Sequence, residues 1–212
     1  APSHNITLSG RNEASLIQVS NLTPGGTTCV VPCDVASNSG VRDAHAEAVA
    51  LYGPVDVLIN NAGIGIFKNM LDMSVQEFDD QIAINLRGTF LCTKAVLPSM
   101  IERRRGMIIS INSVSSIRSF TGGSGYASSK AGSLAMLRSV REEVRDHGIK
   151  VTDILVGATE TEIWSADART EYRDRMMKAH DIATAVEQVI AGFHNPRTHV
   201  EEVVLRPQRG DL

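Results

Sequence analysis

The sequence predicts an α/β fold, a doubly wound parallel sheet of the Rossmann-like type with helices on both faces. Short runs rich in valine, isoleucine and leucine alternate with longer segments of helical periodicity, which is typical of successive βαβ units. The chain has 212 residues and no linker or repeat that would divide it. We therefore expect residues 1–212 to form one domain.

Each expected element follows from this alternation. The strands are expected at residues 5–8, 27–32, 55–59, 106–111, 150–155 and 201–205. The helices, of which the third is long enough to be broken in two, are expected at residues 12–22, 37–52, 74–100, 126–147, 170–177 and 180–194. Ligands of doubly wound sheets bind at the carboxyl ends of strands, so the loops after the first five strands should carry the chemistry.

The composition excludes several classes of partner. Of the residues, 42% are hydrophobic and 21% charged, the formal net charge is -3, and no apolar run approaches the roughly 18 residues of a membrane span. We therefore expect no nucleic-acid and no membrane partner, and, without a secretory signal pattern, a cytoplasmic location. The three cysteines and the histidines show no zinc spacing, so no metal site is expected.

Tyr126 and Lys130 are spaced to share one face of a helix, one turn apart. A nearby ammonium favours the phenolate and should lower the tyrosine pKa from about 10 toward neutrality, where it can exchange a proton with a substrate oxygen. The pair alone is weak evidence, because any amphipathic helix can contain one. Ser113 ends the apolar strand upstream, where its hydroxyl could bond a substrate oxygen or could simply serve as a loop or capping residue.

Two asparagine-containing segments add to this pattern. The sequence Asn60-Asn61-Ala62-Gly63 follows the strand at residues 55–59, and its small residues would let a ligand approach closely, although the segment could be an ordinary turn. Asn85 lies within a helical stretch, where asparagine has poor propensity and so suggests a specific hydrogen bond.

In order and spacing, these segments resemble the short-chain dehydrogenase/reductase family, and the resemblance extends from residue 5 to residue 205. It implies an oxidoreductase that transfers a hydride between a nicotinamide cofactor and a ketone or secondary alcohol. By this resemblance Tyr126 is the general acid and base, Ser113 orients the substrate oxygen, and Lys130 lowers the Tyr126 pKa and bonds the nicotinamide ribose. Asn85 would hold a water molecule that links Lys130 to solvent.

The resemblance also implies a set of cofactor-binding residues. Asp34 and Val35 match the family's contact with the adenine ring, and Thr161 matches a threonine on the nicotinamide side. The full expected set is Arg11, Asp34, Val35, Asn61, Ala62, Gly63, Tyr126, Lys130, Gly157 and Thr161. The family usually has proline where this chain has Val156, which should loosen the loop over the nicotinamide but not abolish activity.

Cofactor choice should depend on the end of the first expected strand, where Arg11 follows Ser9 and Gly10. An arginine can pair with the 2'-phosphate of NADP through charge-assisted bonds, whereas an acidic residue would bond the ribose hydroxyl of NAD. We therefore expect NADP, although Arg11 could also be a solvated surface charge. Trp164, Met176 and Met177 could cap an apolar substrate or simply pack against the body of the protein.

The family assembles as dimers or tetramers through two helices, which match residues 86–100 and 126–147 here. Both carry apolar residues, so we expect a homodimer or homotetramer. These residues are Phe90, Ala95, Val96, Ala131, Leu134 and Leu137.

One part of the family pattern has no counterpart in this sequence, namely the first strand, its glycine-rich phosphate loop and the next helix. In the doubly wound order that strand lies between those at residues 5–8 and 55–59. We therefore expect about 25 to 35 further residues upstream of Ala1 in the natural protein, and weak cofactor binding without them. The same departure leaves open an alternative function, a non-catalytic dinucleotide-binding or interaction protein of the same fold.

Overall fold

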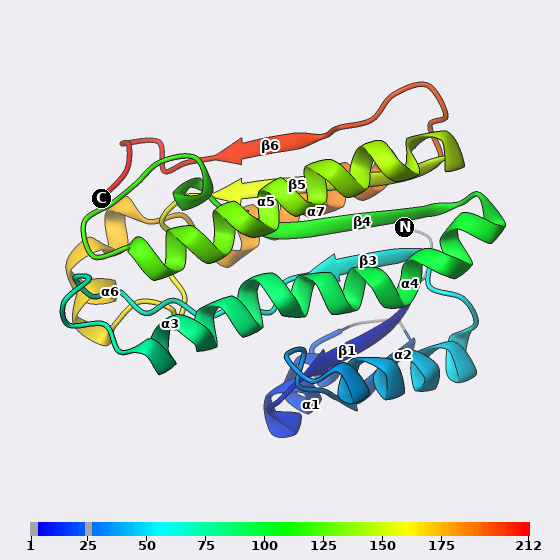
Figure 1. Ribbon diagram of the computed structural model, residues 1–212, viewed down its shortest axis with the longest axis horizontal. Helices are drawn as coiled ribbons and strands as arrows, with labels where there is room; N and C mark the ends of the chain where they lie inside the picture. The colour runs from blue at the N-terminus through cyan, green and yellow to red at the C-terminus, as the bar shows by residue number, and fades with distance from the viewer. Residues whose placement is uncertain (1–3, 24–26) are drawn as a thin grey trace.

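The computed structural model describes residues 4–23 and 27–212 (Figure 1). All strand pairings in this part of the chain are parallel, and they form a two-stranded sheet of order β1-β2 and a four-stranded sheet of order β3-β4-β5-β6. The strands are β1 (Asn5–Gly10), β2 (Thr27–Pro32), β3 (Val57–Asn60), β4 (Gly106–Ser113), β5 (Ile149–Val156) and β6 (Glu202–Leu205).

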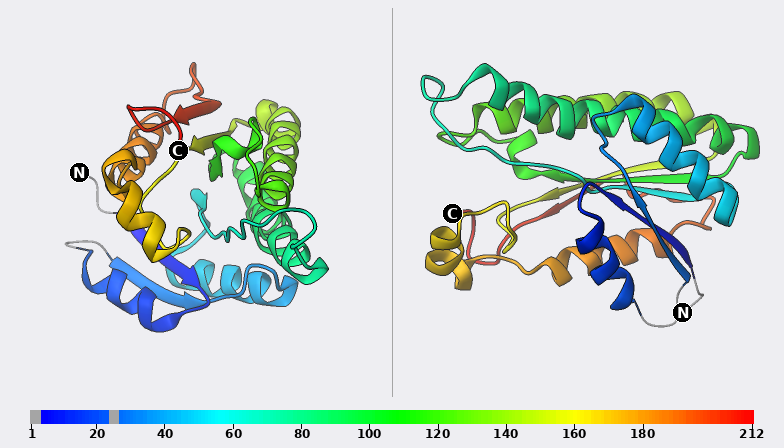
Figure 2. Two further views of the ribbon diagram at one scale, coloured as in Figure 1. Left: turned by 90° about the vertical axis from the view of Figure 1, so that its left-hand side faces the viewer. Right: turned by 90° about the horizontal axis from the view of Figure 1, so that it is seen from below.

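Helices cover both faces of the strands. Figure 2, in its right-hand view, shows α2, α4 and α5 on one face and α1 and α7 on the other. The α-helices are α1 (Glu13–Asn21), α2 (Asn38–Tyr52), α3 (Val75–Gln81), α4 (Thr89–Arg103), α5 (Ser124–Val144), α6 (Ala166–Tyr172) and α7 (Ala179–Ala191). This arrangement confirms the predicted doubly wound α/β fold.

Beyond shifts of one to three residues at the ends of elements, the predicted elements differ from the observed ones in two places. The long third helix is not interrupted by a loop, because a π-helical segment, Ile82–Gly88, joins α3 directly to α4. The helix expected at residues 170–177 begins earlier, at Ala166, because the Ser165 hydroxyl caps it by accepting the Ala168 N–H at 3.2 Å.

The sheet is divided between β1 and β3. In residues 4–23 and 27–212, β1 is hydrogen-bonded to β2 and β3 to β4, so each has one edge that no described strand pairs. This division lies at the position where the predicted strand order requires a further strand.

Alternate residues of the central strand β4 pack against opposite helical layers. Ile108 lies with Val96, Met100, Leu137 and Val151 in an apolar cluster beneath α4 and α5. Met107 and Ile109 point the other way, into a cluster that includes Val189 of α7. The core therefore holds β4 between two layers, and its carboxyl end, Ser113, is fixed relative to both.

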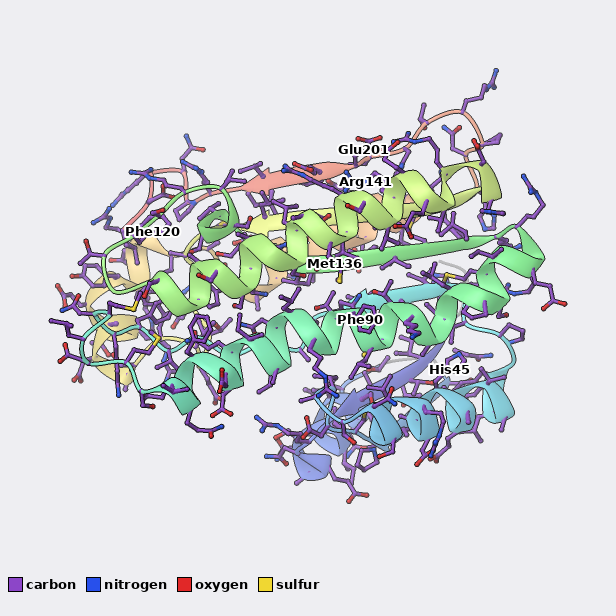
Figure 3. The ribbon with its side chains drawn as sticks, in the orientation of Figure 1. His45, Phe90, Phe120, Met136, Arg141 and Glu201 are labelled. Atoms are coloured by element: carbon purple, nitrogen blue, oxygen red, sulfur yellow. The ribbon has the colours of Figure 1, made fainter. Side chains whose placement is uncertain are left out.

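Part of the predicted oligomer face is core instead. Val96, Leu134 and Leu137 are buried against the sheet, so they are not available to a second subunit. Phe90 of α4, by contrast, is 44% exposed, whereas Met136 of α5 is partly buried and packs against the core cluster beneath the two helices; Figure 3 shows both residues. The apolar periodicity of α4 and α5 thus mainly reflects packing on the sheet.

A buried ion pair joins α5 to β5 and β6. The Arg141 guanidinium, 5% exposed, donates to the fully buried Asp153 carboxylate at 3.1 Å and to the backbone oxygens of Val151 and Glu201 at 2.8 and 2.9 Å. Figure 3 shows Arg141 on α5 beside Glu201. Burial raises the pKa of Asp153 to about 6, despite the opposing effects of Asn112 and Arg141.

We predict that Arg141→Ala lowers the free energy of unfolding by about 3–5 kcal/mol near neutral pH, because it leaves the Asp153 carboxylate buried and unpaired. Because the pKa of Asp153 is higher in the folded protein than in the unfolded chain, protonation of Asp153 stabilises the folded state. This contribution to the free energy of unfolding is lost as the pH rises through about 6. Removing Arg141 should raise that pKa further, so the destabilisation should be larger above pH 6 than below it. Urea unfolding at about pH 5 and about pH 7.5 measures both values.

The matched control is Arg138→Ala, on the same helix. Arg138 pairs with Glu202 at 2.7 Å but is 48% exposed in its side chain, so its loss should cost only about 0.2–1 kcal/mol at either pH. Equal effects of the two substitutions, or an Arg141→Ala effect that does not vary with pH, would contradict the role given to the buried pair.

Candidate active site

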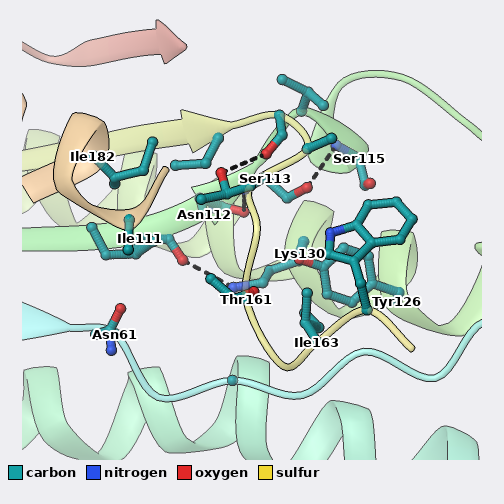
Figure 4. Close-up of a pocket in the computed structure, with 18 of the residues that line it drawn as sticks. Asn61, Ile111, Asn112, Ser113, Ser115, Tyr126, Lys130, Thr161, Ile163 and Ile182 are labelled. Atoms are coloured by element: carbon teal, nitrogen blue, oxygen red, sulfur yellow. Dashed lines mark hydrogen bonds between the residues drawn. The ribbon is translucent and has the colours of Figure 1, made fainter. Parts of the chain in front are cut away.

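A cavity of about 1140 Å³ lies at the carboxyl ends of the strands of the larger sheet. Loops after β3, β4 and β5 form its walls, as the topology of a doubly wound sheet predicts. Figure 4 shows that several residues predicted from the sequence converge here from different elements. The predicted residues that line the cavity are Asn61, Gly63, Ser113, Tyr126, Lys130, Gly157 and Thr161.

Tyr126 lies in the first turn of α5 and faces Ser113 at the end of β4. Its side chain is buried, and this burial raises the pKa of Tyr126, while a hydrogen bond with Ser113 acts in the opposite direction. The sequence predicted that Lys130 would lower the pKa of Tyr126. In the protein alone the pKa is raised instead, because desolvation of the phenolate dominates. Tyr126 is thus protonated at neutral pH and can donate a proton.

Lys130 follows Tyr126 by one turn of α5, as its spacing predicts. Its ammonium donates to the Ile111 carbonyl at 2.9 Å and lies 6.0 Å from the centre of the Tyr126 ring. Burial lowers the pKa of Lys130 to about 8, and the charge of Asp153 limits this decrease. Lys130 therefore carries a positive charge at neutral pH that it loses in mildly alkaline solution.

Asn85 is buried within the π-helical segment between α3 and α4. Its side-chain oxygen accepts the Ile64 N–H at 2.9 Å, and its amide donates to the Ile64 carbonyl at 2.8 Å and to Ser129 at 2.9 Å. Short π-helical segments often occur at functional sites. Here Asn85 connects the loop after β3 to the helix that carries Tyr126 and Lys130.

The loop after β3 leaves little room for side chains near these groups. A Cβ atom added at Gly63 would lie 3.2 Å from the Asn85 oxygen and 3.6 Å from the Lys130 nitrogen. The Gln81 side chain accepts the Ile66 N–H at 3.0 Å and holds the loop at a second point. This narrow, fixed approach to Lys130 suits a flat ring that contacts backbone directly.

The remaining predicted cofactor residues lie outside the cavity lining. Arg11 follows β1 and is exposed, and Ala62 is exposed in the loop after β3. Asp34 follows β2 and its carboxylate accepts the Ala36 N–H at 2.9 Å. Val35 packs against the end of the π-helical segment, where a Cβ at Gly88 would lie only 2.8 Å from its methyl group. These four residues lie at strand ends or in the loops that follow them, where the topology predicts them.

Sequence reasoning did not identify Asn112, which supports Ser113. Asn112 accepts the Ser113 N–H at 2.9 Å and reaches the Asp153 carboxylate at 3.4 Å, so the buried ion pair extends to the end of β4. A polar signal was present, because Asn112 and Asp153 interrupt apolar strands. The two residues, however, are 41 positions apart in the sequence, and they become neighbours only through the pairing of β4 with β5.

Comparisons with known proteins agree with this geometry. Residues 3–172 match the family described as short chain dehydrogenase. The chain belongs to that family. A sepiapterin reductase of Chlorobaculum tepidum is 34% identical over 209 residues, which cover 98% of this chain and 84% of the relative.

Solved structures of the family share the fold. An alcohol dehydrogenase from Thermococcus sibiricus, complexed with 5-hydroxy-NADP, has a TM-score of 0.86 and 25% identity, and the match covers 97% of this chain and 87% of the other. A metagenomic short-chain oxidoreductase in complex with NADP has a TM-score of 0.81 and 28% identity, with 96% and 86% covered. This short-chain dehydrogenase is therefore an NAD(P)-dependent oxidoreductase.

Two kinds of feature are absent from the described residues. In residues 4–23 and 27–212, no group of three or more histidine, cysteine, aspartate or glutamate side chains is placed to hold a metal ion. Among the helices of the same residues, none is both long and apolar enough to cross a membrane.

We predict that reduction by the nicotinamide cofactor slows as the pH rises through about 8, because Lys130 then loses its positive charge, which lies 6.0 Å from the centre of the Tyr126 ring. The measurement is kcat at saturating cofactor between pH 6 and about pH 10, with cofactor affinity followed separately across the same range. A rate that stays constant to pH 10 would show that the Lys130 charge does not support the reaction.

Proposed function

We propose that the protein transfers a hydride between NADP(H) and the carbonyl carbon of a ketone, or the reverse for a secondary alcohol. The observation that carries this proposal is the convergence of Ser113, Tyr126 and Lys130 in one cavity at the carboxyl ends of the strands. The chemistry expected of the three groups is complementary, since one polarises an oxygen, one donates a proton and one supplies positive charge.

A bound nicotinamide cofactor would supply or accept the hydride. Asn61, Ala62 and Gly63 would hold it from one side, and Gly157 and Thr161 from the other. The fit is supported by Gly63, which lines the cavity and has no side chain to occupy the space near Lys130. Asp34 and Val35 would contact the adenine end from the loop after β2.

During reduction, the Tyr126 hydroxyl would donate its proton to the substrate oxygen, which Ser113 would orient by a second hydrogen bond. Lys130 would stabilise the phenolate left on Tyr126 and would bond the cofactor ribose through its ammonium group. The side-chain amide of Asn85 already bonds the Ile64 backbone. Asn85 would also position a water molecule beside Lys130, through which a proton returns from solvent. Oxidation of an alcohol would run these steps in reverse.

The choice of NADP rests on Arg11. Its exposed position just after β1 leaves the guanidinium free to pair with the 2'-phosphate. NADP is also the cofactor in the solved structure of the metagenomic oxidoreductase, which is similar in fold and 28% identical in sequence.

We also propose a homodimer or homotetramer built on the outer side of α4 and α5. Support comes from Phe90 of α4, a large apolar side chain that is 44% exposed. Large exposed apolar side chains on adjacent helices are common at subunit interfaces.

The proposed role of Tyr126 predicts that Tyr126→Phe lowers kcat by at least about a hundredfold, because general acid catalysis commonly contributes that much or more. Fold and cofactor affinity should change little, since only a hydroxyl is removed. Reduction of a panel of ketones, followed by the loss of NADPH absorbance, measures the effect. Tyr52→Phe at the end of α2 makes the same chemical change outside the cavity lining and should retain full activity.

The proposed role of Arg11 predicts that Arg11→Asp shifts the preference from NADP toward NAD, because a carboxylate repels the phosphate and can accept a bond from the ribose hydroxyl. The measurement is the ratio of kcat/KM values for NADPH and NADH in the full-length protein. Arg42→Asp, an equal charge change on the exposed side of α2, should leave the ratio unchanged. An unchanged ratio in Arg11→Asp would mean that Arg11 does not contact the cofactor.

A further inference from the structure

We propose that the substrate is a neutral aryl ketone, or the corresponding alcohol, whose aromatic ring stacks on a wall formed by Phe67 and Trp164. This inference rests on the proposed function, because it names the class of carbonyl compound that the Tyr126 site accepts. The aromatic wall is defined by these two side chains, and its Phe67 ring adjoins both Tyr126 and Trp164.

The aromatic wall begins at the reactive group itself. The Phe67 ring lies 5.2 Å from the Tyr126 ring, tilted by 58°, and 5.8 Å from the Trp164 ring, stacked at 15°. These rings come from three separate elements, the loop after β3, the start of α5 and the loop after β5. A ligand whose oxygen meets Tyr126 can therefore lay its apolar body along Phe67 and Trp164.

The remainder of this part of the cavity is also apolar. Ile64, Ile163 and Phe120 line it together with the aromatic wall. Phe67 lines the cavity and is 45% exposed, so its ring offers apolar surface that a ligand can cover. Aromatic rings at centre distances of 4.5–7 Å attract one another beyond the effect of buried area, by a factor of about 2 to 12 in binding.

The charged groups around the cavity favour a neutral ligand. Asp211 pairs with Arg118 at 2.7 Å and with Arg206 at 3.2 Å, and its backbone oxygen accepts a bond from Arg175 at 2.8 Å. An anionic ligand would have to compete with this carboxylate for the arginines. The Lys130 ammonium at the reactive end disfavours a cationic ligand in the same way.

The kinetic test compares two ketones of similar size in the full-length protein with NADPH. Acetophenone carries a flat ring, whereas cyclohexyl methyl ketone carries a puckered one. We expect kcat/KM to be higher for acetophenone, and Trp164→Leu should reduce the ratio of the two values about threefold to tenfold. Phe90→Leu, an equivalent loss of an aromatic ring on the outer side of α4, should leave the ratio unchanged. Para-carboxyacetophenone should be reduced more slowly than acetophenone, because it carries a negative charge.

A binding test does not require turnover or a folded Trp164 variant. Trp164 is the single tryptophan of the sequence, so intrinsic fluorescence reports on the wall alone. Dimethyl phenyl carbinol and its cyclohexyl counterpart are tertiary alcohols that cannot release a hydride. In the NADP-saturated protein we expect a saturable fluorescence change with the phenyl compound at concentrations where the cyclohexyl compound gives none. Phe67→Leu should weaken that change.

The outcomes separate the two proposals. Reduction of both ketones with equal efficiency, a ratio unaffected by Trp164→Leu, or equal fluorescence changes would overturn the aryl-ketone inference and leave the oxidoreductase function intact. No reduction of any ketone in the panel, together with no oxidation of the corresponding alcohols, would overturn the proposed function and this inference with it.

Discussion

The ion pair between Arg141 and Asp153 is the constraint on which the geometry of the site depends. Two charges are removed from water in the middle of the molecule, which is favourable only if every polar atom around them is satisfied. Arg141 meets this condition by bonding β5 and the residue before β6 as well as the carboxylate. The pair therefore fixes the position of α5 along the sheet, and α5 carries both Tyr126 and Lys130 at its other end.

The same carboxylate connects to the second half of the site. Asp153 reaches Asn112, and Asn112 holds the backbone of Ser113. The serine and the tyrosine thus come from different elements but share one buried anchor. On the side of the loop after β3, Asn85 performs a comparable task, because its amide ties this loop to α5 through Ser129. Each reactive side chain is held by neighbours that are themselves hydrogen-bonded.

Much of the fold could be predicted from the sequence because its signals are local. The strand at residues 27–32 has the predicted bounds, and each of the other strands differs by one or two residues at one or both ends. The spacing of Tyr126 and Lys130 was sufficient to place them on one face of a helix. The raised pKa of Tyr126 could not be predicted in the same way, since it depends on burial by the loops after β3 and β5, which are distant in the sequence. Similarly, the stacking of Phe67 on Trp164 joins residues nearly a hundred positions apart.

The π-helical segment at Ile82–Gly88 has a consequence for how this chain tolerates changes in length. A π-turn holds an additional residue relative to an α-turn, so removing one residue here would allow α3 and α4 to merge into a regular α-helix. Side chains outside the segment would keep their orientation, because the π-turn is what accommodates the additional residue, whereas side chains within the segment would shift about the helix axis. Asn85 would no longer face Ile64, although no atom of the reactive groups had been altered. Substitutions within the segment preserve this geometry far more readily than single-residue deletions or insertions. Variants of this enzyme should therefore keep the length of the π-helical segment unchanged.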